Sequence, residues 1–326
     1  MHTTSARSVL LVDADAGHPR LDAFLHRRLA TVSHREIHRA IAQALITVNG
    51  RPSTKGQRVH PGDRIDVGAL LASPPAPPHE LEIATLYDDG VILALAKPAG
   101  IPSTARRIGG RAGVAGYLLQ RMPELATVAP SPLDAGLVHR LDTETSGVLL
   151  VARTAAAWRA LRDQFSRKAV DKEYVAVVRG RLRSRRILAD DLEHDPRRPG
   201  AMRLVMRRSS RRHWHAVSTV NPVAWAKNAT RLEVRIRTGV THQIRAQLAA
   251  IGHPVLGDRL YDTASPPSPV GDRLLLDASD VRVVHPTSGA PVAVHAPLPR
   301  DFAATLARLG FAPEGHGTSA VRPARR

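Results

Sequence analysis

A lone aspartate, followed by small polar residues, is the clearest candidate for chemistry in this sequence. Asp142 lies in the segment 137–147, which leads directly into the apolar run Val148–Ala152. Substrate chemistry is often carried by loops that a buried strand holds in place. Asp142 could equally cap the turn formed by the residues after it, so this residue alone leaves a catalytic and a structural interpretation open.

Other catalytic arrangements around Asp142 fit less well. His139 and Arg140 precede it as in a kinase catalytic loop, but the aspartate stands one position late and no downstream asparagine or glycine-rich phosphate loop accompanies it. Asp142 with Glu144 or Asp134 could form a glycosidase pair, and a nucleoside hydrolase would cut a similar bond. Neither alternative explains why the N-terminal region is rich in basic residues.

A metal site is not expected. His34 and His38 have the four-residue spacing that can bind a metal on a helix, but no third ligand accompanies them. The chain has no cysteine, which excludes disulfides, thiolate zinc sites and a cysteine nucleophile. We therefore expect the two histidines to contact solvent, or RNA if the chain binds nucleic acid.

The charge of the chain favours a polyanionic partner. Its 326 residues contain 47 Lys and Arg against 29 Asp and Glu, which gives a net charge of +18. A genome rich in G and C would explain the preference for Arg over Lys, but not this excess, and nucleic acid is the commonest partner of such a protein. No apolar run reaches the ~20 residues of a membrane span and no signal peptide is recognisable, so we expect a cytoplasmic protein that binds no membrane.

Proline and charge patterns divide the chain into parts. Four prolines within residues 73–78 predict an extended spacer that no packed element would contain. Arg181–His213 is rich in arginine and is either an RNA-facing insertion or a solvated loop. The predicted parts are an extension at 1–18, a small domain at 19–68, a linker at 69–82, a large domain at 83–310 and a disordered tail at 311–326.

The small domain resembles the S4 RNA-binding domain. Its pattern predicts two helices, the second with a capping box from Ser33 to Glu36, and then a ribbon with a hairpin turn at Asn49-Gly50. The resemblance lies in the runs 20–25, 32–38, 46–50 and 61–63, although His34 stands where the family usually has Ser or Arg. It implies RNA binding, while a helical hairpin with solvated charges is the structural alternative.

The large domain alternates strand and helix signals irregularly, which predicts an α+β fold with a mainly antiparallel mixed sheet. Strands are expected at 91–96, 147–153, 174–178 and 232–236. Thr154 is expected to cap a helix, and Thr241 to cap another that Gly252 ends.

Four blocks of the large domain, in order, resemble the RluA-type pseudouridine synthases. They are Lys97–Gly100, Val138–Gly147, Asp171–Gly180 and Arg237–Tyr261, and the resemblance covers about residues 83–305. It implies the pseudouridine synthase fold and conversion of uridine to pseudouridine in RNA, without cofactor. An S4 domain before this catalytic domain is a known arrangement of the family.

The resemblance also implies roles for individual residues. Asp142 matches the catalytic aspartate, Arg245 its positively charged partner, and Tyr174 the ring that lies against the target uracil. Arg140 matches a residue that fills the gap left by the flipped base, which offsets a cost of a few kcal/mol. Other polar residues of these blocks are expected to bind substrate: His139, Thr145, Lys172, Thr241, His242 and Gln243.

The sequence departs from the family pattern at several positions. Ala96 stands where Asn is common, Val240 where the family usually has Arg, and Gln247 and Asp277 where it often has His. These departures bear on the RNA substrate more than on the reaction. We expect a monomer with no obligate protein partner that modifies large-subunit ribosomal RNA. The alternatives are transfer RNA as substrate, or a non-catalytic RNA-binding or ribosome-assembly factor on the same fold.

Overall fold

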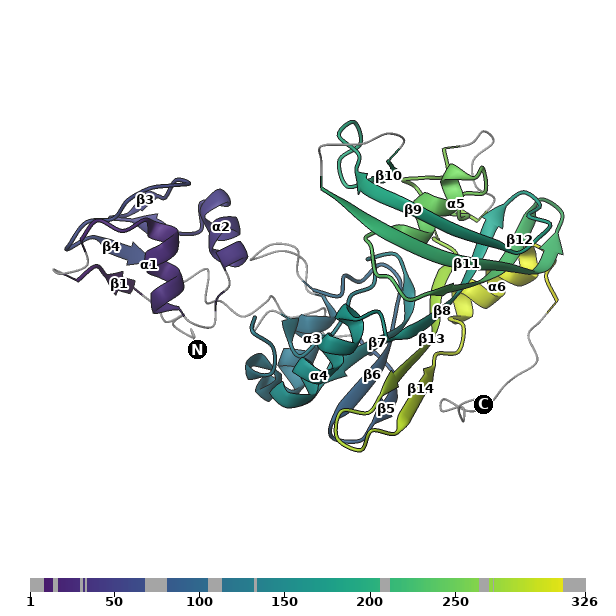
Figure 1. Ribbon diagram of the computed structural model, residues 1–326, viewed down its shortest axis with the longest axis horizontal. Helices are drawn as coiled ribbons and strands as arrows, with labels where there is room; N and C mark the ends of the chain where they lie inside the picture. The colour runs from purple at the N-terminus through teal and green to yellow at the C-terminus, as the bar shows by residue number, and fades with distance from the viewer. Residues whose placement is uncertain are drawn as a thin grey trace. The chain divides into compact units, whose positions relative to one another are not determined.

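The chain forms two compact units. The computed structural model describes residues 9–13, 17–29, 32, 34–67, 81–104, 113–131, 134–205, 212–263, 270–271 and 273–312 (Figure 1). One unit consists of Met1–Leu81 and Thr104–Leu137, and the other of Glu82–Ser103 and Val138–Arg326. Most of the predicted linker and tail, and the side chains of the predicted capping box, lie outside the described residues.

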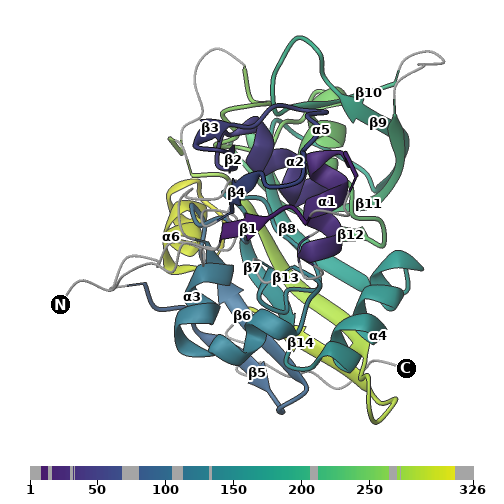
Figure 2. The same ribbon diagram turned by 90° about the vertical axis from the view of Figure 1, so that its left-hand side faces the viewer.

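The N-terminal part of the first unit is a small sheet with two helices. The sheet has the order β1-β4-β2-β3 and all its pairs are antiparallel. Figures 1 and 2 show the helices α1 and α2 packed together beside it. The elements are α1 (Leu21–Arg28), α2 (His34–Ala42), β1 (Val9–Leu11), β2 (Thr47–Val48), β3 (Arg51–Pro52) and β4 (Arg64–Asp66).

Local sequence explains this small sheet. Asn49 and Gly50 have φ values of 52° and 78°, which a two-residue hairpin turn of this hand requires, so the predicted turn is confirmed. Apolar residues from both helices and from the strands form one core, which includes Leu25, Ile37 and Ile65. Strand β1, from the stretch expected to precede this domain, pairs with β4. The same unit contains α3 (Val114–Arg121) and the short 3₁₀ helix η1 (Pro123–Thr127).

The second unit is built on a ten-stranded sheet. Its order is β10-β9-β11-β12-β8-β13-β7-β6-β5, with β14 paired to β13. Among the described strands only β7 and β13 pair in parallel, so the predicted α+β class with a mainly antiparallel sheet is confirmed. The strands are β5 (Thr85–Asp88), β6 (Ile92–Lys97), β7 (Ser146–Ala152), β8 (Asp171–Arg179), β9 (Arg186–His194), β10 (Met202–Leu204), β11 (His213–Ala226), β12 (Ala229–Ile236), β13 (Leu276–Val284) and β14 (Pro291–His295).

Buried apolar strands fix the position of the loop that contains Asp142. Every residue of β7 is buried, as are nearly all of β6, as their apolar runs predict. Their antiparallel register places Lys97 opposite Gly147, and the parallel pair of β7 with β13 places Ser146 opposite Asp277. The loop before β7 is therefore held at its end by two neighbouring strands.

Three helices complete this unit: α4 (Ala155–Ser166), α5 (Gln243–Ala250) and α6 (Arg300–Arg308). The Thr154 hydroxyl accepts the Ala157 N–H at 3.1 Å, which confirms the predicted cap of α4. The predicted cap of α5 at Thr241 is wrong, because the helix begins one residue later, after His242 in a left-handed conformation. In the described part of the chain, no helix has the length and apolarity needed to cross a membrane.

Candidate active site

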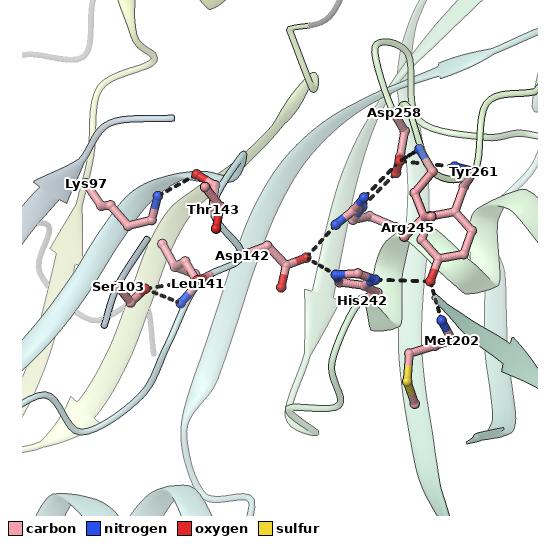
Figure 3. A network of polar contacts seen from close by, with 11 residues as sticks. Lys97, Ser103, Leu141, Asp142, Thr143, Met202, His242, Arg245, Asp258 and Tyr261 are labelled. Carbon is pink, nitrogen blue, oxygen red and sulfur yellow. Dashed lines mark hydrogen bonds and ion pairs between the residues drawn. The ribbon is translucent and has the colours of Figure 1, made fainter. Parts of the chain in front are cut away.

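Three hydrogen bonds from two side chains fix the backbone on either side of Asp142 (Figure 3). The Ser103 hydroxyl donates to the Leu141 carbonyl at 2.9 Å and accepts the Leu141 N–H at 3.0 Å. The Lys97 ammonium donates to the Thr143 carbonyl at 3.0 Å. Since both neighbours of Asp142 are held by the segment 97–103, the direction of the carboxylate is set by the backbone as well as by its own partners.

Arg245 connects Asp142 to a second, fully buried carboxylate. Its Nη1 donates to Asp142 Oδ2 at 3.0 Å, while Nε and Nη2 donate to the two oxygens of Asp258 at 2.7 and 2.8 Å. The Asp258 side chain is fully buried and that of Asp142 is 24% exposed. Asp258 thus fixes the plane of the guanidinium with two of its five N–H groups, and an N–H of Nη1 is donated to the accessible carboxylate.

The triad of Asp142, Arg245 and Asp258 contains one guanidinium and two carboxyl groups. Burial opposes the charged form of Arg245, but the hydrogen bonds and charge of Asp258 raise the pKa of the guanidinium above its ordinary value. Asp142 adds to this effect. One permanent cation therefore faces two carboxylates, and Asp258 accepts two of its three hydrogen bonds to them.

His242 provides a second polar contact to Asp142. Its Nε2 lies 3.8 Å from Asp142 Oδ2, and its Nδ1 is 3.1 Å from the Tyr261 hydroxyl. The Tyr261 oxygen accepts the Met202 N–H at 2.7 Å, so its own proton can be donated to Nδ1. The imidazole proton then resides on Nε2, the nitrogen that faces Asp142.

Tyr174 lies on β8 as an almost fully buried ring. Burial raises the pKa of its hydroxyl, and the carboxylates of Asp142 and Asp277 raise it further. The tyrosine therefore stays neutral. A neutral ring at this position can stack on a base, and its hydroxyl can donate a hydrogen bond.

Gln243 and Lys172 hold the loop before α5. The Gln243 Oε1 accepts the Thr238 hydroxyl at 2.9 Å and the Val240 N–H at 3.2 Å. The Lys172 ammonium donates to the Thr238 carbonyl at 2.6 Å, and burial lowers its pKa to about 8. Their described contacts are within the protein, so the structure brings them to the loop that precedes Arg245 and not to the Asp142 carboxylate itself.

The other expected substrate contacts differ in their surroundings. The Leu150 N–H donates to His139 Nε2 at 3.0 Å, and burial with nearby cations lowers the pKa of this imidazole to about 3. The Thr145 hydroxyl is buried and has no hydrogen-bond partner among the described residues. Arg140 and Thr241 are exposed. From the expected substrate-binding set, only His242 contacts the Asp142 carboxylate with its side chain, while the Thr145 N–H donates to the Asp142 backbone carbonyl at 3.2 Å.

Three residues that depart from the family pattern make contacts within the protein. Gln247 is buried and is hydrogen-bonded to the Ser218 hydroxyl at 2.7 Å and to Asp190 at 2.8 Å, which ties α5 to β11 and β9. Asp277 accepts the Ser146 hydroxyl at 2.5 Å, and burial raises the pKa of its carboxyl to about 6. Val240 precedes α5 and makes the backbone contact to Gln243.

Sequence reasoning missed several residues that organise the site. Asp258 and Tyr261 lie in the last matching block, but nothing in their spacing indicates that they face Arg245 and His242. Ser103 lies outside the matching blocks, and the block that contains Lys97 implies no role for its side chain. Within the described parts of the chain, no three His, Cys, Asp or Glu side chains are grouped in a way that could hold a metal ion.

The fold and site together define the class of protein. A family model of RNA pseudouridylate synthases matches residues 91–250, and a model of the S4 domain matches residues 19–65. The ribosomal large subunit pseudouridine synthase D of Xanthomonas campestris is 32% identical over 94% of this chain and 93% of its own length. An uncharacterized RNA pseudouridine synthase of Chloroflexus aurantiacus is 33% identical over 89% of this chain and 90% of its own.

A solved structure agrees with this fold. Human RNA pseudouridylate synthase domain containing 1 has a TM-score of 0.57 and 22% identity, and the match covers 74% of this chain and all of the human one. The chain thus contains a pseudouridine synthase domain and an S4 domain. The chain belongs to the RNA pseudouridylate synthase family, which confirms both resemblances seen in the sequence.

Proposed function

We propose that this enzyme converts specific uridines of large-subunit ribosomal RNA to pseudouridine, with Asp142 as its catalytic residue. The curated relatives of Xanthomonas campestris and Nitrosomonas europaea, at 32% and 29% identity, carry the name of ribosomal large subunit pseudouridine synthase D. The observation that supports the catalytic role most directly is the part-exposed Asp142 carboxylate, 3.0 Å from an arginine that a buried Asp258 orients.

The net reaction breaks the bond between N1 of uracil and C1′ of ribose and forms one between C5 and C1′. The C5 proton is lost and N1 gains a proton, so the reaction requires no redox partner and no external energy source. Asp142 attacks the sugar, attacks the base or removes a ribose proton. Each route requires its ionised form, and the Arg245 guanidinium donates a hydrogen bond to this carboxylate at 3.0 Å.

Tyr174 and Arg140 are proposed to handle the nucleotide. The neutral ring of Tyr174 stacks on the target uracil, a contact of about 1–3 kcal/mol, and its hydroxyl assists removal of the C5 proton. Arg140 is exposed and has no ion pair among the described residues, so it is free to enter the space vacated by a flipped base.

The test is pseudouridine mapping of total RNA from cells with and without the gene. Loss of specific positions in large-subunit ribosomal RNA, restored by the wild-type gene, supports the proposal. Loss confined to transfer RNA overturns the substrate, and release of free uracil by the purified protein overturns the reaction. An unchanged map indicates a binding or assembly factor without catalysis.

A further inference from the structure

Four exposed arginines gather in the connection between β8 and β9 and at the first residue of β9. Arg181, Arg183, Arg185 and Arg186 are exposed, and among the described residues none of them has an acidic partner. No acidic residue occurs from Gly180 to Ala189. This part of the arginine-rich segment is therefore a region of unneutralised positive charge on the catalytic unit.

The backbone of this connection is fixed. Leu182 is 1% exposed, and its N–H donates to the Thr230 hydroxyl at 3.0 Å. The Gly180 N–H donates to the Asn228 carbonyl at 2.9 Å, and the Thr230 hydroxyl donates to the Gly180 carbonyl at 2.7 Å. The connection therefore packs along the hairpin of β11 and β12 (Figure 1), and its arginines project from an ordered backbone instead of a solvated loop.

An exposed aromatic ring lies beside these arginines. Trp225, near the end of β11, is 44% exposed, although its Nε1 donates to the Leu182 carbonyl at 2.8 Å. The indole N–H is thus anchored to Leu182, the residue between Arg181 and Arg183, while much of the ring remains accessible. The exposed Lys227 in the following turn adds a further cation.

Three other exposed arginines of this unit are paired with carboxylates. Arg235 pairs with Glu173 at 3.0 Å, and Arg237 pairs with Asp171 at 2.6 Å. Arg167 on α4 pairs with Asp163 at 2.9 Å. The connection after β8 differs from them because its charges have no such partners and because an accessible indole accompanies them.

We propose that this surface, formed by Arg181, Arg183, Arg185, Arg186, Trp225 and Lys227, binds RNA at a distance from the modified nucleotide. Guanidinium groups bind phosphates in a bidentate manner, and an exposed indole stacks on an unpaired base. Tyr174 lies five residues before the end of β8. Since a strand rises about 3.3 Å per residue, the surface is roughly 15–20 Å from the site. The inference rests on the proposed function only in that the substrate is RNA.

The experiment compares two triple variants of the full-length protein that lose the same charge. Arg181→Gln/Arg183→Gln/Arg185→Gln removes unpaired arginines, and the control Arg167→Gln/Arg235→Gln/Arg237→Gln removes paired ones. Affinity for an in vitro transcribed large-subunit ribosomal RNA is measured at several salt concentrations. Removing one phosphate-binding cation reduces the slope of log K against log salt by about 0.7–0.9, so we expect a reduction of about 2–3 for the first variant and less than 1 for the control.

The ring is tested by Trp225→Phe and Trp225→Ala. We expect Trp225→Ala to weaken binding of the same RNA about tenfold with little change in salt slope, and Trp225→Phe to retain most of the affinity. Single-turnover rates at saturating enzyme should stay at the wild-type value in all variants, because none of these residues contacts Asp142 or Arg245. Thermal unfolding of each variant verifies that it is folded.

If the first triple variant binds this RNA with wild-type affinity and salt slope, the proposal is overturned. This holds even if the surface binds another anionic partner. An equal loss in the control would also overturn it, because general charge would explain both. These outcomes are independent of the proposed function, which fails only if the wild-type protein forms no pseudouridine in this RNA.

Discussion

Arg245 interacts with two carboxylates that differ in burial, and this difference separates their roles. Asp258 is fully buried and takes two hydrogen bonds from the guanidinium, whereas Asp142 is part-exposed and takes one. A buried bidentate pair is rigid, so Asp258 is suited to orient Arg245. The Asp142 side chain is 24% exposed, which agrees with the proposed contact of its carboxylate with a nucleotide.

Replacing Asp142 with Asn should abolish pseudouridine formation, by at least about a thousandfold, and leave RNA affinity within a few-fold. The side chains are nearly isosteric, so the fold should persist, but every proposed route requires the negative charge. Tritium release from C5-labelled RNA measures activity, and filter binding measures affinity. Turnover near the wild-type rate by the purified variant would contradict the assignment of Asp142.

Arg245→Met should be more destabilising than the double variant Arg245→Met/Asp258→Asn. The single change leaves the buried Asp258 carboxylate without a counter-charge, which costs about 3–5 kcal/mol of the free energy of unfolding. The amide of Asn removes that charge and can still accept the N–H groups of Leu260 and Tyr261. Urea unfolding of both variants is the measurement; equal stabilities would show that the pair is not coupled. Both should be inactive.

Lys97 should make stability depend on pH above neutrality. Burial lowers the pKa of its ammonium from 10.5 to about 7, against the opposing effect of Asp142. Between these two values the unfolded chain binds more protons than the folded one, so this residue makes stability rise with pH. In Lys97→Met, the free energy of unfolding should rise less steeply from pH 7 to 9 than in the wild-type protein. The difference between the two slopes should be up to about 1.4 kcal/mol per pH unit. Identical slopes would mean that Lys97 stays charged.

At the scale of elements, features set by residues close together in the sequence were predicted better than contacts between residues far apart. Thr154 and the Asn49-Gly50 turn could be read from sequence because their hydrogen bonds involve neighbours in the chain. The start of α5 could not, because Gln243 turns its amide back to Thr238 and Val240 and replaces a threonine cap. Asp258 was missed for the related reason that its partner lies on another element.

The family motifs nevertheless predicted the centre of the site. Asp142 and Arg245 are 103 residues apart and meet at 3.0 Å, as the resemblance implied. Periodicity could not have paired them, since strand order and register bring them together. Arg245 itself is buried, as are its neighbours from Gln243 to Leu248, so α5 has no solvated face at this turn.

The contact between β7 and β13 should be sensitive to any side chain at Gly147. Gly147 has φ of 118°, and a Cβ there would overlap the backbone of Ala278 on β13. We expect Gly147→Ala to lower the free energy of unfolding by about 3 kcal/mol or more, through strain and separation of the two strands. Gly289→Ala is the control, because Gly289 also has a positive φ of 70° but open space around it, and should cost about 1 kcal/mol. Comparable losses in chemical denaturation would contradict the proposed close contact.

At the scale of the whole molecule, basic residues occur in both units, while the proposed catalytic residues lie in only one. Asp142, Tyr174 and Arg245 all belong to the second unit, and the S4 domain contributes none of them. Residues 19–68 contain nine basic and four acidic residues, an excess of 9 − 4 = +5. Contacts to phosphates position a protein on RNA without reading its bases, so this domain is suited to add affinity.

Deletion of residues 1–78 should therefore weaken binding to long structured RNA and reduce its salt dependence, while the chemical step persists. For every phosphate that the S4 domain binds, its deletion lowers the slope of log K against log salt by about one. Single-turnover rates at saturating enzyme separate the two effects, because they report chemistry after binding is complete. A folded truncated protein with full affinity and an unchanged slope would show that the S4 domain does not bind this RNA. Normal binding with a collapsed rate would show instead that the deleted region completes the active site.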